Sequence, residues 1–153
     1  MMGVGKSTLG KMVAEKLELA FIDTDIKIEE KCSMKISEIF KKKGEKFFRM
    51  EEEKEVLKSL KKKNCVIALG GGAFLNNTVR NHILKDAVSI WLDVNLKILN
   101  KRIKWNNKRP LLDKKNSQKK INELYAQRKN IYKLANYKIN CNNSDKESIL
   151  EKI

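Results

Sequence analysis

The first eight residues contain the end of a phosphate-binding loop. Gly5, Lys6 and Ser7, which Thr8 follows, match the last three positions of the signature G-x-x-x-x-G-K-[ST], a turn that joins a strand to a helix. Glycines in such a turn let backbone N–H groups point into one concavity, and the helix N-terminus adds positive potential. The motif predicts a nucleotide phosphate site and a helix that starts near Lys6, although a chance G-x-G-K-S is the alternative.

The strand that should precede this loop is not in the sequence. The signature needs a glycine five residues before Gly5, at residue 0. We expect that the first, central strand of a parallel sheet is missing, through a truncated chain or a misplaced start codon, with Met1 or Met2 an internal methionine. The neighbouring strands would then be unpaired, which would lower stability and activity. An in-frame apolar segment upstream that ends in Gly would support this hypothesis.

Strand and helix patterns alternate along the rest of the chain. Continuous apolar runs predict buried strands, and apolar residues at helical spacing predict helices. The strands are expected over 19–23, 65–69, 87–92 and 137–141, and the helices over 6–17, 25–32, 36–43 (ended by Gly44), 45–62, 78–85, 96–104, 119–135 and 146–153. This alternation indicates one α/β domain over residues 1–153, with a parallel sheet and with ligands at the carboxyl ends of its strands.

Composition excludes several other classes of protein. The 153 residues are 41% hydrophobic and 35% charged, without an apolar run that could span a membrane and without a signal-peptide pattern. Cys32, Cys65 and Cys141 are widely spaced, which argues against a disulfide framework or a zinc site. His82 is the only histidine, and it lies in a predicted helix, where a structural or exposed position is the more common one.

The net charge of +15 has two explanations. A basic surface can bind polyanions such as nucleic acid. Alternatively, the charge accompanies a nucleotide site on a lysine-rich background, with lysine runs such as 41–43 and 61–63 solvated at helix ends. We favour the second explanation, and expect no nucleic-acid partner, because no RNA- or DNA-binding motif accompanies the charge.

Two carboxylates follow the first predicted strand. Asp23 and Asp25 should point to the same side of an extended segment, because alternate residues of a strand share a face. Near a phosphate loop, one could hold Mg²⁺ through water and the other could accept a hydrogen bond, or a proton, from a substrate hydroxyl. A helix N-cap formed by Asp or by Thr24 is an equally good explanation.

A run of three glycines and a few arginines complete the candidate site. Gly70, Gly71 and Gly72 directly follow a predicted buried strand, where they would allow a ligand to approach the backbone closely, although a simple tight turn is the alternative. The arginines stand out in a chain dominated by lysine, and their planar fork suits bidentate binding of carboxylate or phosphate. These arginines are Arg49, Arg109 and Arg128, and for each one alone a solvated helix charge is the default.

In combination, these motifs resemble a known family. "GVGKST", "FIDTD", "FFRME", "LGGGA", "RPLL" and "YAQRKNIY" occur in the order and spacing of shikimate kinases, over essentially the whole chain. The resemblance implies a small cytoplasmic P-loop kinase of the nucleoside-monophosphate-kinase type, with a three-layer α/β/α fold around a parallel sheet. Such a kinase transfers the γ-phosphoryl group of ATP to the 3-hydroxyl of shikimate, in the pathway to aromatic amino acids.

The resemblance also implies a role for individual residues. Catalysis is assigned to Lys6, Asp25 (as general base) and Arg109, and Mg²⁺ to Ser7 and Asp23. ATP contacts are assigned to Gly3, Val4, Gly5, Lys6, Ser7, Thr8, Arg102 (packing on adenine) and Arg109 (reaching the phosphates). Shikimate contacts are assigned to Asp25, Arg49, Gly70, Gly71, Gly72 and Arg128, with both arginines on the substrate carboxylate.

The same resemblance implies how the domain is organised, and two alternative functions remain open. Residues of about 25–62 would form the substrate-binding helices, residues of about 105–118 the lid, and the protein would be a monomer. One departure is "NCNNSDKE", which lacks the arginine and proline often found in the adenine loop of the family. The alternatives are another small P-loop kinase, such as a gluconate or nucleotide kinase, and, from a different class, a basic RNA-binding module.

Overall fold

The computed structural model describes residues 1, 3–104, 117–142 and 145–153. Strands and helices alternate within these ranges, close to the bounds that the sequence predicts. The elements in chain order are α1 (Lys6–Lys16), β1 (Ala20–Asp23), α2 (Thr24–Cys32), α3 (Ile36–Leu60), β2 (Cys65–Ala68), the short 3₁₀ helix η1 (Ala73–Leu75), α4 (Asn77–Asp86), β3 (Ile90–Asp93), α5 (Leu96–Lys104), α6 (Ser117–Tyr132), β4 (Tyr137–Asn140) and α7 (Lys146–Leu150).

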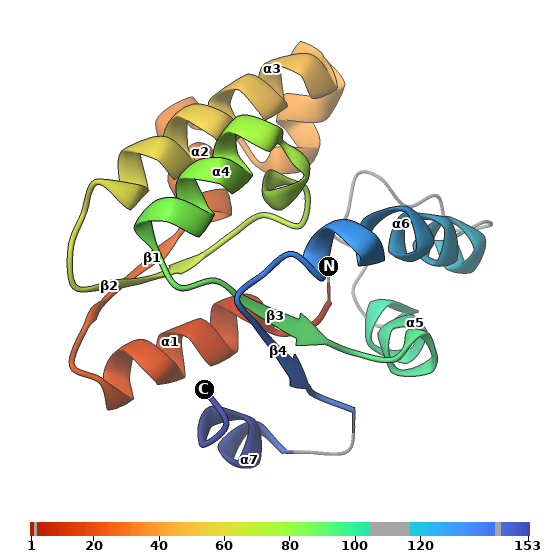
Figure 1. The fold of residues 1–153 in the computed structure, drawn as a ribbon. Helices are drawn as coiled ribbons and strands as arrows, with labels where there is room; N and C mark the ends of the chain where they lie inside the picture. Colours follow the sequence, from red (N-terminus) through yellow and green to blue (C-terminus); the bar gives the residue numbers. More distant parts are fainter. Residues whose placement is uncertain (2, 105–116, 143–144) are drawn as a thin grey trace.

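The strands form two parallel pairs. Strand β1 pairs with β2, with Ala20 opposite Cys65, and β3 pairs with β4, with Ile90 opposite Tyr137. The prediction of parallel strands is therefore confirmed, but the strands of the described residues form two two-stranded sheets and not one continuous sheet. Helix α1 lies on one side of the strands, and α3 and α4 lie on the other side of β1 and β2 (Figure 1).

The burial of β2 differs from the prediction of a fully buried strand. Only Ala68 is buried, while Val66 and Ile67 are half-buried. In β3, Trp91 and Leu92 are buried, whereas Ile90 is 37% exposed. The physical reason is that each of these strands has a strand neighbour on one edge only, within the part of the chain that the structure describes.

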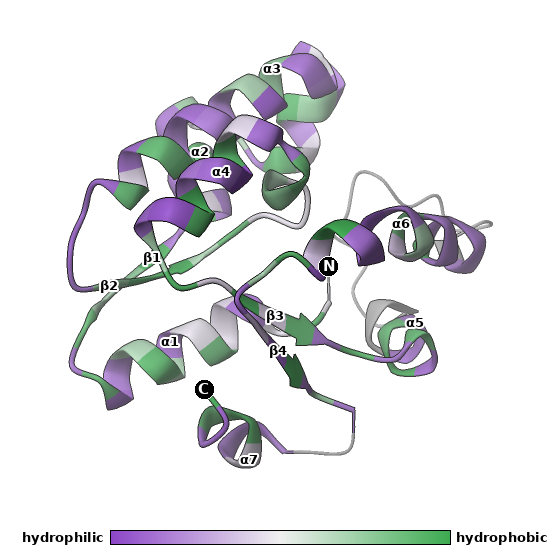
Figure 2. Ribbon diagram, in the orientation of Figure 1, coloured by the Kyte–Doolittle hydropathy of each residue, from purple (hydrophilic) through white to green (hydrophobic). Residues whose placement is uncertain are grey.

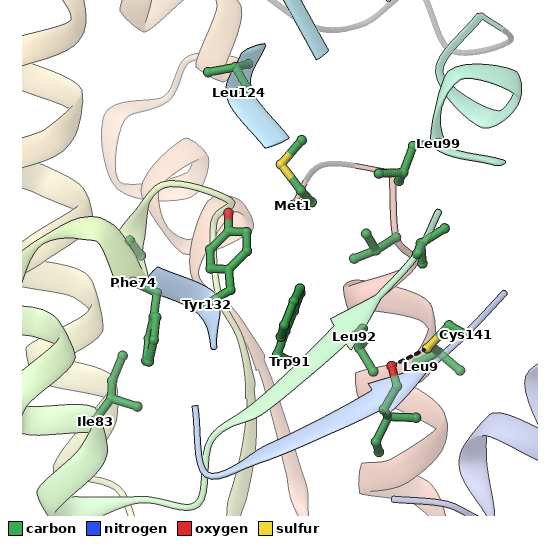
Figure 3. Close-up of a cluster of buried hydrophobic side chains, with 14 of the residues drawn as sticks. Met1, Leu9, Phe74, Ile83, Trp91, Leu92, Leu99, Leu124, Tyr132 and Cys141 are labelled. Atoms are coloured by element: carbon green, nitrogen blue, oxygen red, sulfur yellow. Dashed lines mark hydrogen bonds between the residues drawn. The ribbon is translucent and has the colours of Figure 1, made fainter. Parts of the chain in front are cut away.

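Two apolar clusters stabilise the fold. The larger cluster joins residues from α1, β3, α5, α6 and β4, and it includes Leu9, Trp91, Leu92, Leu99, Ile121, Tyr132 and Cys141 (Figure 3). The smaller cluster consists of Ile28, Ile39 and Phe48 and holds α2 against α3. Figure 2 shows hydrophobic colour along most of the strands and a mixture of hydrophilic and hydrophobic residues along α3 and α6. None of the helices in the described ranges is long and apolar enough to cross a membrane.

Helix α3 contains a sharp irregularity at Gly44. The sequence predicts two helices that are separated there, and the structure agrees, because Gly44 interrupts the helical conformation of α3 (Ile36–Leu60) with φ 81° and ψ 168°. That combination of angles is open essentially to glycine alone. Gly44 therefore changes the direction of the chain directly before Glu45, although the two helical segments are continuous in sequence.

Candidate active site

The phosphate loop is a short turn with left-handed glycines. Gly3 and Gly5 have φ angles of 76° and 93°, and α1 begins directly after Gly5. Within the described residues, the N-cap Gly5 provides no side-chain hydrogen bond to this helix start, where the first backbone N–H groups have no partner inside the helix. Lys6 donates from Nζ to the carbonyl oxygen of Met1 over 2.8 Å. The loop thus has the backbone geometry that anions bind.

Asp23 connects the phosphate loop to β1 and α2. The hydroxyl of Ser7 donates to Asp23 Oδ2 over 2.5 Å, and Asp23 Oδ1 accepts from the backbone N–H of Asp25 and Ile26 over 3.0 and 3.3 Å. Asp23 is thus the N-cap of α2, which was one of the two explanations left open for this segment. The expected extended geometry of residues 23–25 is wrong, because α2 already begins at Thr24.

The run Gly70–Gly72, called the glycine turn below, is held by side chains from distant parts of the chain. The buried Thr24 donates to Ala68 O over 3.2 Å and accepts from Gly70 N over 3.2 Å. From the other side, Arg128 Nη1 and the Tyr132 hydroxyl both donate to Gly71 O, over 3.1 and 2.5 Å. These contacts hold the glycine turn between α2 and α6. The three glycines are therefore packed against other elements, which a simple tight turn would not require.

Arg49 lies against the far end of the glycine turn. A Cβ atom at Gly72 would overlap Arg49 Nη1 and would lie 3.0 Å from Nη2, so the turn can come this close only with glycine. The guanidinium donates to Glu52 Oε2 from Nη1 over 2.7 Å, and to Glu45 Oε1 from Nη2 and Nε over 3.0 and 3.2 Å. Burial alone would lower the pKa of Arg49, but the two glutamates raise it above its ordinary value.

Glu52 brings a second carboxylate next to Asp25. A Cβ atom at Gly70 would overlap Glu52 Oε1 and would lie 2.7 Å from Asp25 Oδ1, so the two acids flank the same glycine. The Glu52 side chain is 4% exposed, and its Oε1 atom has no hydrogen-bond partner in the part of the chain that the structure describes. Burial raises the pKa of Glu52, Arg49 opposes this shift, and Asp25 adds to it, with a net rise.

Comparisons with known proteins identify the family. A family model of shikimate kinases matches residues 2–153. The chain belongs to the shikimate kinase family. It is 43% identical over 152 residues to the shikimate kinase of Sulfurihydrogenibium sp., covering 99% of this chain and 90% of that relative. The shikimate kinase of Bartonella henselae is 39% identical over 153 residues, covering 100% of this chain and 73% of that relative.

Solved structures of shikimate kinases have the same fold. The structure of the Acinetobacter baumannii enzyme in complex with shikimate has a TM-score of 0.94 at 32% identity, and the match covers 99% of this chain and 85% of that one. The Bacteroides thetaiotaomicron enzyme has a TM-score of 0.89 at 30% identity, with 99% and 90% covered. The chain therefore has the α/β shikimate kinase fold and is an ATP-dependent phosphotransferase of aromatic amino acid biosynthesis.

The structure brings most of the residues predicted for this shikimate kinase site together. Contacts with the glycine turn connect Asp25, Arg49 and Arg128, the residues predicted to bind the acceptor, and Ser7 contacts Asp23 at the start of α1. Arg109 and residues 105–116 of the predicted lid lie outside the described residues, as does the side chain of Arg102. The donor set at Ser7 and Asp23 consists of a hydroxyl and a carboxylate, which is the chemistry that Mg²⁺ prefers.

Sequence reasoning missed four residues of this site. Thr24 and Tyr132 hold the glycine turn, and Glu45 and Glu52 contact Arg49. The two glutamates carried a usable signal, because they lie four residues before and three residues after the arginine, on the same face of a helix. Thr24 and Tyr132 carried none, since their partners are 46 and 61 residues away in sequence.

Proposed function

We propose that this chain transfers the γ-phosphoryl group of ATP to the 3-hydroxyl of shikimate at the glycine turn. The observation that carries the proposal is that Arg49 and Arg128 both contact the glycine turn, at Gly72 and Gly71, with Asp25 beside Gly70. A small carboxylated polyol needs fixed cations for its carboxylate and a carboxylate acceptor for its hydroxyls. All three groups meet here within one turn of backbone.

The acceptor is held at one end and activated at the other. Arg49 and Arg128 bind the substrate carboxylate, while Asp25 and the backbone of Gly71 orient the ring hydroxyls. The 3-hydroxyl oxygen attacks the γ-phosphorus, the bond from that phosphorus to the β–γ bridging oxygen breaks, and ADP leaves with the bond's electron pair. The hydroxyl proton passes to Asp25, which acts as general base. Positioning and charge neutralisation carry most of such a transfer.

The nucleotide occupies the other half of the site. The backbone N–H groups of residues 3–8 bind the phosphates, and Lys6 contacts the β- and γ-phosphates. Ser7 and Asp23 would hold Mg²⁺, which when bound neutralises charge on the phosphates. We assign Arg102 to the adenine and Arg109 to the phosphates from the lid over about 105–118, which would exclude water.

The wider organisation is part of the same proposal. One domain over residues 1–153 acts as a monomer, with the substrate-binding helices over about 25–62. Its helices and parallel strands form three layers of the P-loop type, α/β/α. The positions of α1 on one side of the strands and of α3 and α4 on the other support this arrangement (Figure 1).

The test is an assay of ADP release with alternative acceptors. Shikimate, gluconate and the nucleoside monophosphates are each offered with MgATP, and ADP is coupled to NADH oxidation. We expect saturable, shikimate-dependent turnover only. Arg49→Ala should raise the KM for shikimate far more than the KM for ATP. Turnover with another acceptor and none with shikimate, or an equal loss for both substrates in Arg49→Ala, would contradict the proposal.

A further inference from the structure

Each nitrogen of the Arg49 guanidinium group donates one hydrogen bond to a glutamate before any substrate binds. Glu52 Oε2 accepts from Nη1, while Glu45 Oε1 accepts from both Nη2 and Nε. The edge formed by Nε and Nη2 is one of the two edges by which an arginine binds a carboxylate bidentately. A substrate carboxylate that used this edge would meet the carboxylate of Glu45 already bound to it.

The two glutamates differ in how firmly they are held. The Glu52 side chain is 4% exposed, whereas the Glu45 side chain is 56% exposed. Removing a buried partner from an ion pair leaves an uncompensated charge, so Glu52 stays with Arg49. An exposed ion pair contributes little and is screened by salt, so Glu45 can leave when a better anion arrives. Of the two partners of Arg49, Glu45 is therefore the one that costs less to displace.

The chain direction at Gly44 fixes where Glu45 lies. Glu45 directly follows the non-helical Gly44, and its carboxylate reaches Arg49 one helical turn further along α3. A Cβ atom at Gly44 would meet nothing within 4 Å, so the glycine is required by its backbone angles and not by lack of space. The kink thus sets the start of the segment that carries both Glu45 and Arg49.

We propose that Glu45 is a built-in competitor for the substrate carboxylate on Arg49. This inference rests on the proposed function, because it needs Arg49 to bind the carboxylate of shikimate. In the empty site, Glu45 neutralises the Nε–Nη2 edge, and the substrate displaces it on binding. An uncharged polyol has no group that can replace Glu45, so the exchange favours acceptors that bear a carboxylate and disfavours neutral ones.

The experiment compares shikimate binding by wild type, Glu45→Gln and a matched control, using isothermal titration calorimetry without nucleotide. Glu15→Gln is the control, because Glu15 is also exposed and also pairs with a cation four residues away, Lys11, on α1. The two variants change the net charge equally. We expect Glu45→Gln to lower the Kd for shikimate roughly two- to fivefold, the range that exposed ion pairs contribute, and Glu15→Gln to leave it unchanged.

Three further readouts make the result specific. In the coupled assay, Glu45→Gln should lower the KM for shikimate and leave the KM for ATP unchanged, and the advantage should shrink with added salt. The methyl ester of shikimate lacks the negative charge, so its Kd should be the same for wild type and for Glu45→Gln. An unchanged or weaker affinity for shikimate in Glu45→Gln would overturn the competitor role of Glu45 and leave the proposed function intact. If wild type neither binds shikimate nor releases ADP with it, the proposed function falls as well.

Discussion

The two halves of the site are built in different ways. The proposed acceptor side, made of Asp25, Arg49, the glycine turn and Arg128, is held by side chains whose partners are up to 61 residues distant in sequence. The nucleotide side, made of residues 3–8, is a turn and a helix start whose lysine contacts a carbonyl oxygen five residues away. The hydrogen bond from Ser7 to Asp23 connects the two halves.

This difference has a consequence for ligand binding. An acceptor site that is assembled by the fold is in place before a ligand arrives, and preorganisation reduces the entropy lost on binding. A loop of backbone N–H groups depends less on particular side chains. Substitutions on the acceptor side should therefore change shikimate binding without changing ATP binding, and several of them should change the stability of the fold as well.

Substitutions of the two neighbouring carboxylates, Asp25 and Asp23, should give the largest difference between the kinetic effects on the acceptor side and on the nucleotide side. Asp25→Asn should lower kcat by roughly 10²- to 10⁴-fold, because the base for the acceptor hydroxyl is lost, with the KM for ATP nearly unchanged. Asp23→Asn is the matched control, and it should raise the Mg²⁺ concentration required for half-maximal rate. Steady-state kinetics at varied Mg²⁺ distinguish the two. A kcat for Asp25→Asn within threefold of wild type would contradict the assignment.

A methyl group at the glycine turn should disturb the acceptor alone. In Gly72→Ala, the new Cβ overlaps Arg49 Nη1, so the guanidinium must move away from the turn. We expect the KM for shikimate to rise about tenfold or more, equivalent to about 1.4 kcal/mol, while the KM for ATP is retained. A parallel rise in both KM values would remove the distinction between the two sides.

Backbone strain introduced at Gly44, next to the segment that carries Arg49, should lower the free energy of unfolding. Gly44→Ala forces a side chain into φ and ψ angles of 81° and 168°, which we expect to destabilise the protein by about 1–3 kcal/mol. Since nothing lies within 4 Å of the added Cβ, the loss comes from the backbone and not from a clash. Denaturant unfolding measures it. An unfolding free energy equal to that of wild type would show that the kink relaxes without cost.

The smallest effect concerns the pH dependence of stability at Glu52. Its pKa is raised in the folded protein, so its contribution to stability is complete below the unfolded value of about 4.3 and is lost as pH rises through the folded value. The unfolding free energy of wild type relative to Glu52→Gln should therefore fall from pH 4 to pH 7, by about 1.4 kcal/mol for each unit of the shift.

Glu51, the preceding residue, supplies the opposite sign. A hydrogen bond from Lys31 lowers the pKa of Glu51, so its contribution should grow as pH rises through the folded value. The unfolding free energy of wild type relative to that of Glu51→Gln should therefore increase as pH rises. Denaturant titrations of the three proteins at several pH values test both signs. Curves with the same slope for both variants would contradict the difference in environment.

Much of this site was predictable from residue types and spacing. The phosphate loop, the glycine turn and the arginines Arg49 and Arg128 stand out by residue type and position, and the resemblance of their combined motifs to shikimate kinases predicts their roles. The parallel pairing of the strands followed from their alternation with helices. What could not be predicted was which partner each group chooses, since Arg128 and Gly71 are 57 residues apart and meet only when the fold forms.

Errors in the prediction have a common physical cause. The exposure of β2 and the geometry at Asp25 were misjudged because both were inferred from local pattern, while tertiary context decided them. An apolar run predicts a fully buried strand only if other elements cover both faces of the sheet around it. A D-x-D segment remains extended only if no helix starts inside it, and here Asp23 caps a helix that begins one residue later.

The most direct test of a preformed acceptor side is calorimetric titration of shikimate into wild type, Arg49→Met and Arg128→Met, in the absence of nucleotide. We expect saturable one-to-one binding to wild type, weakened about tenfold or more by either substitution. Binding to wild type only when MgATP is present, or equal Kd values for all three proteins, would contradict it.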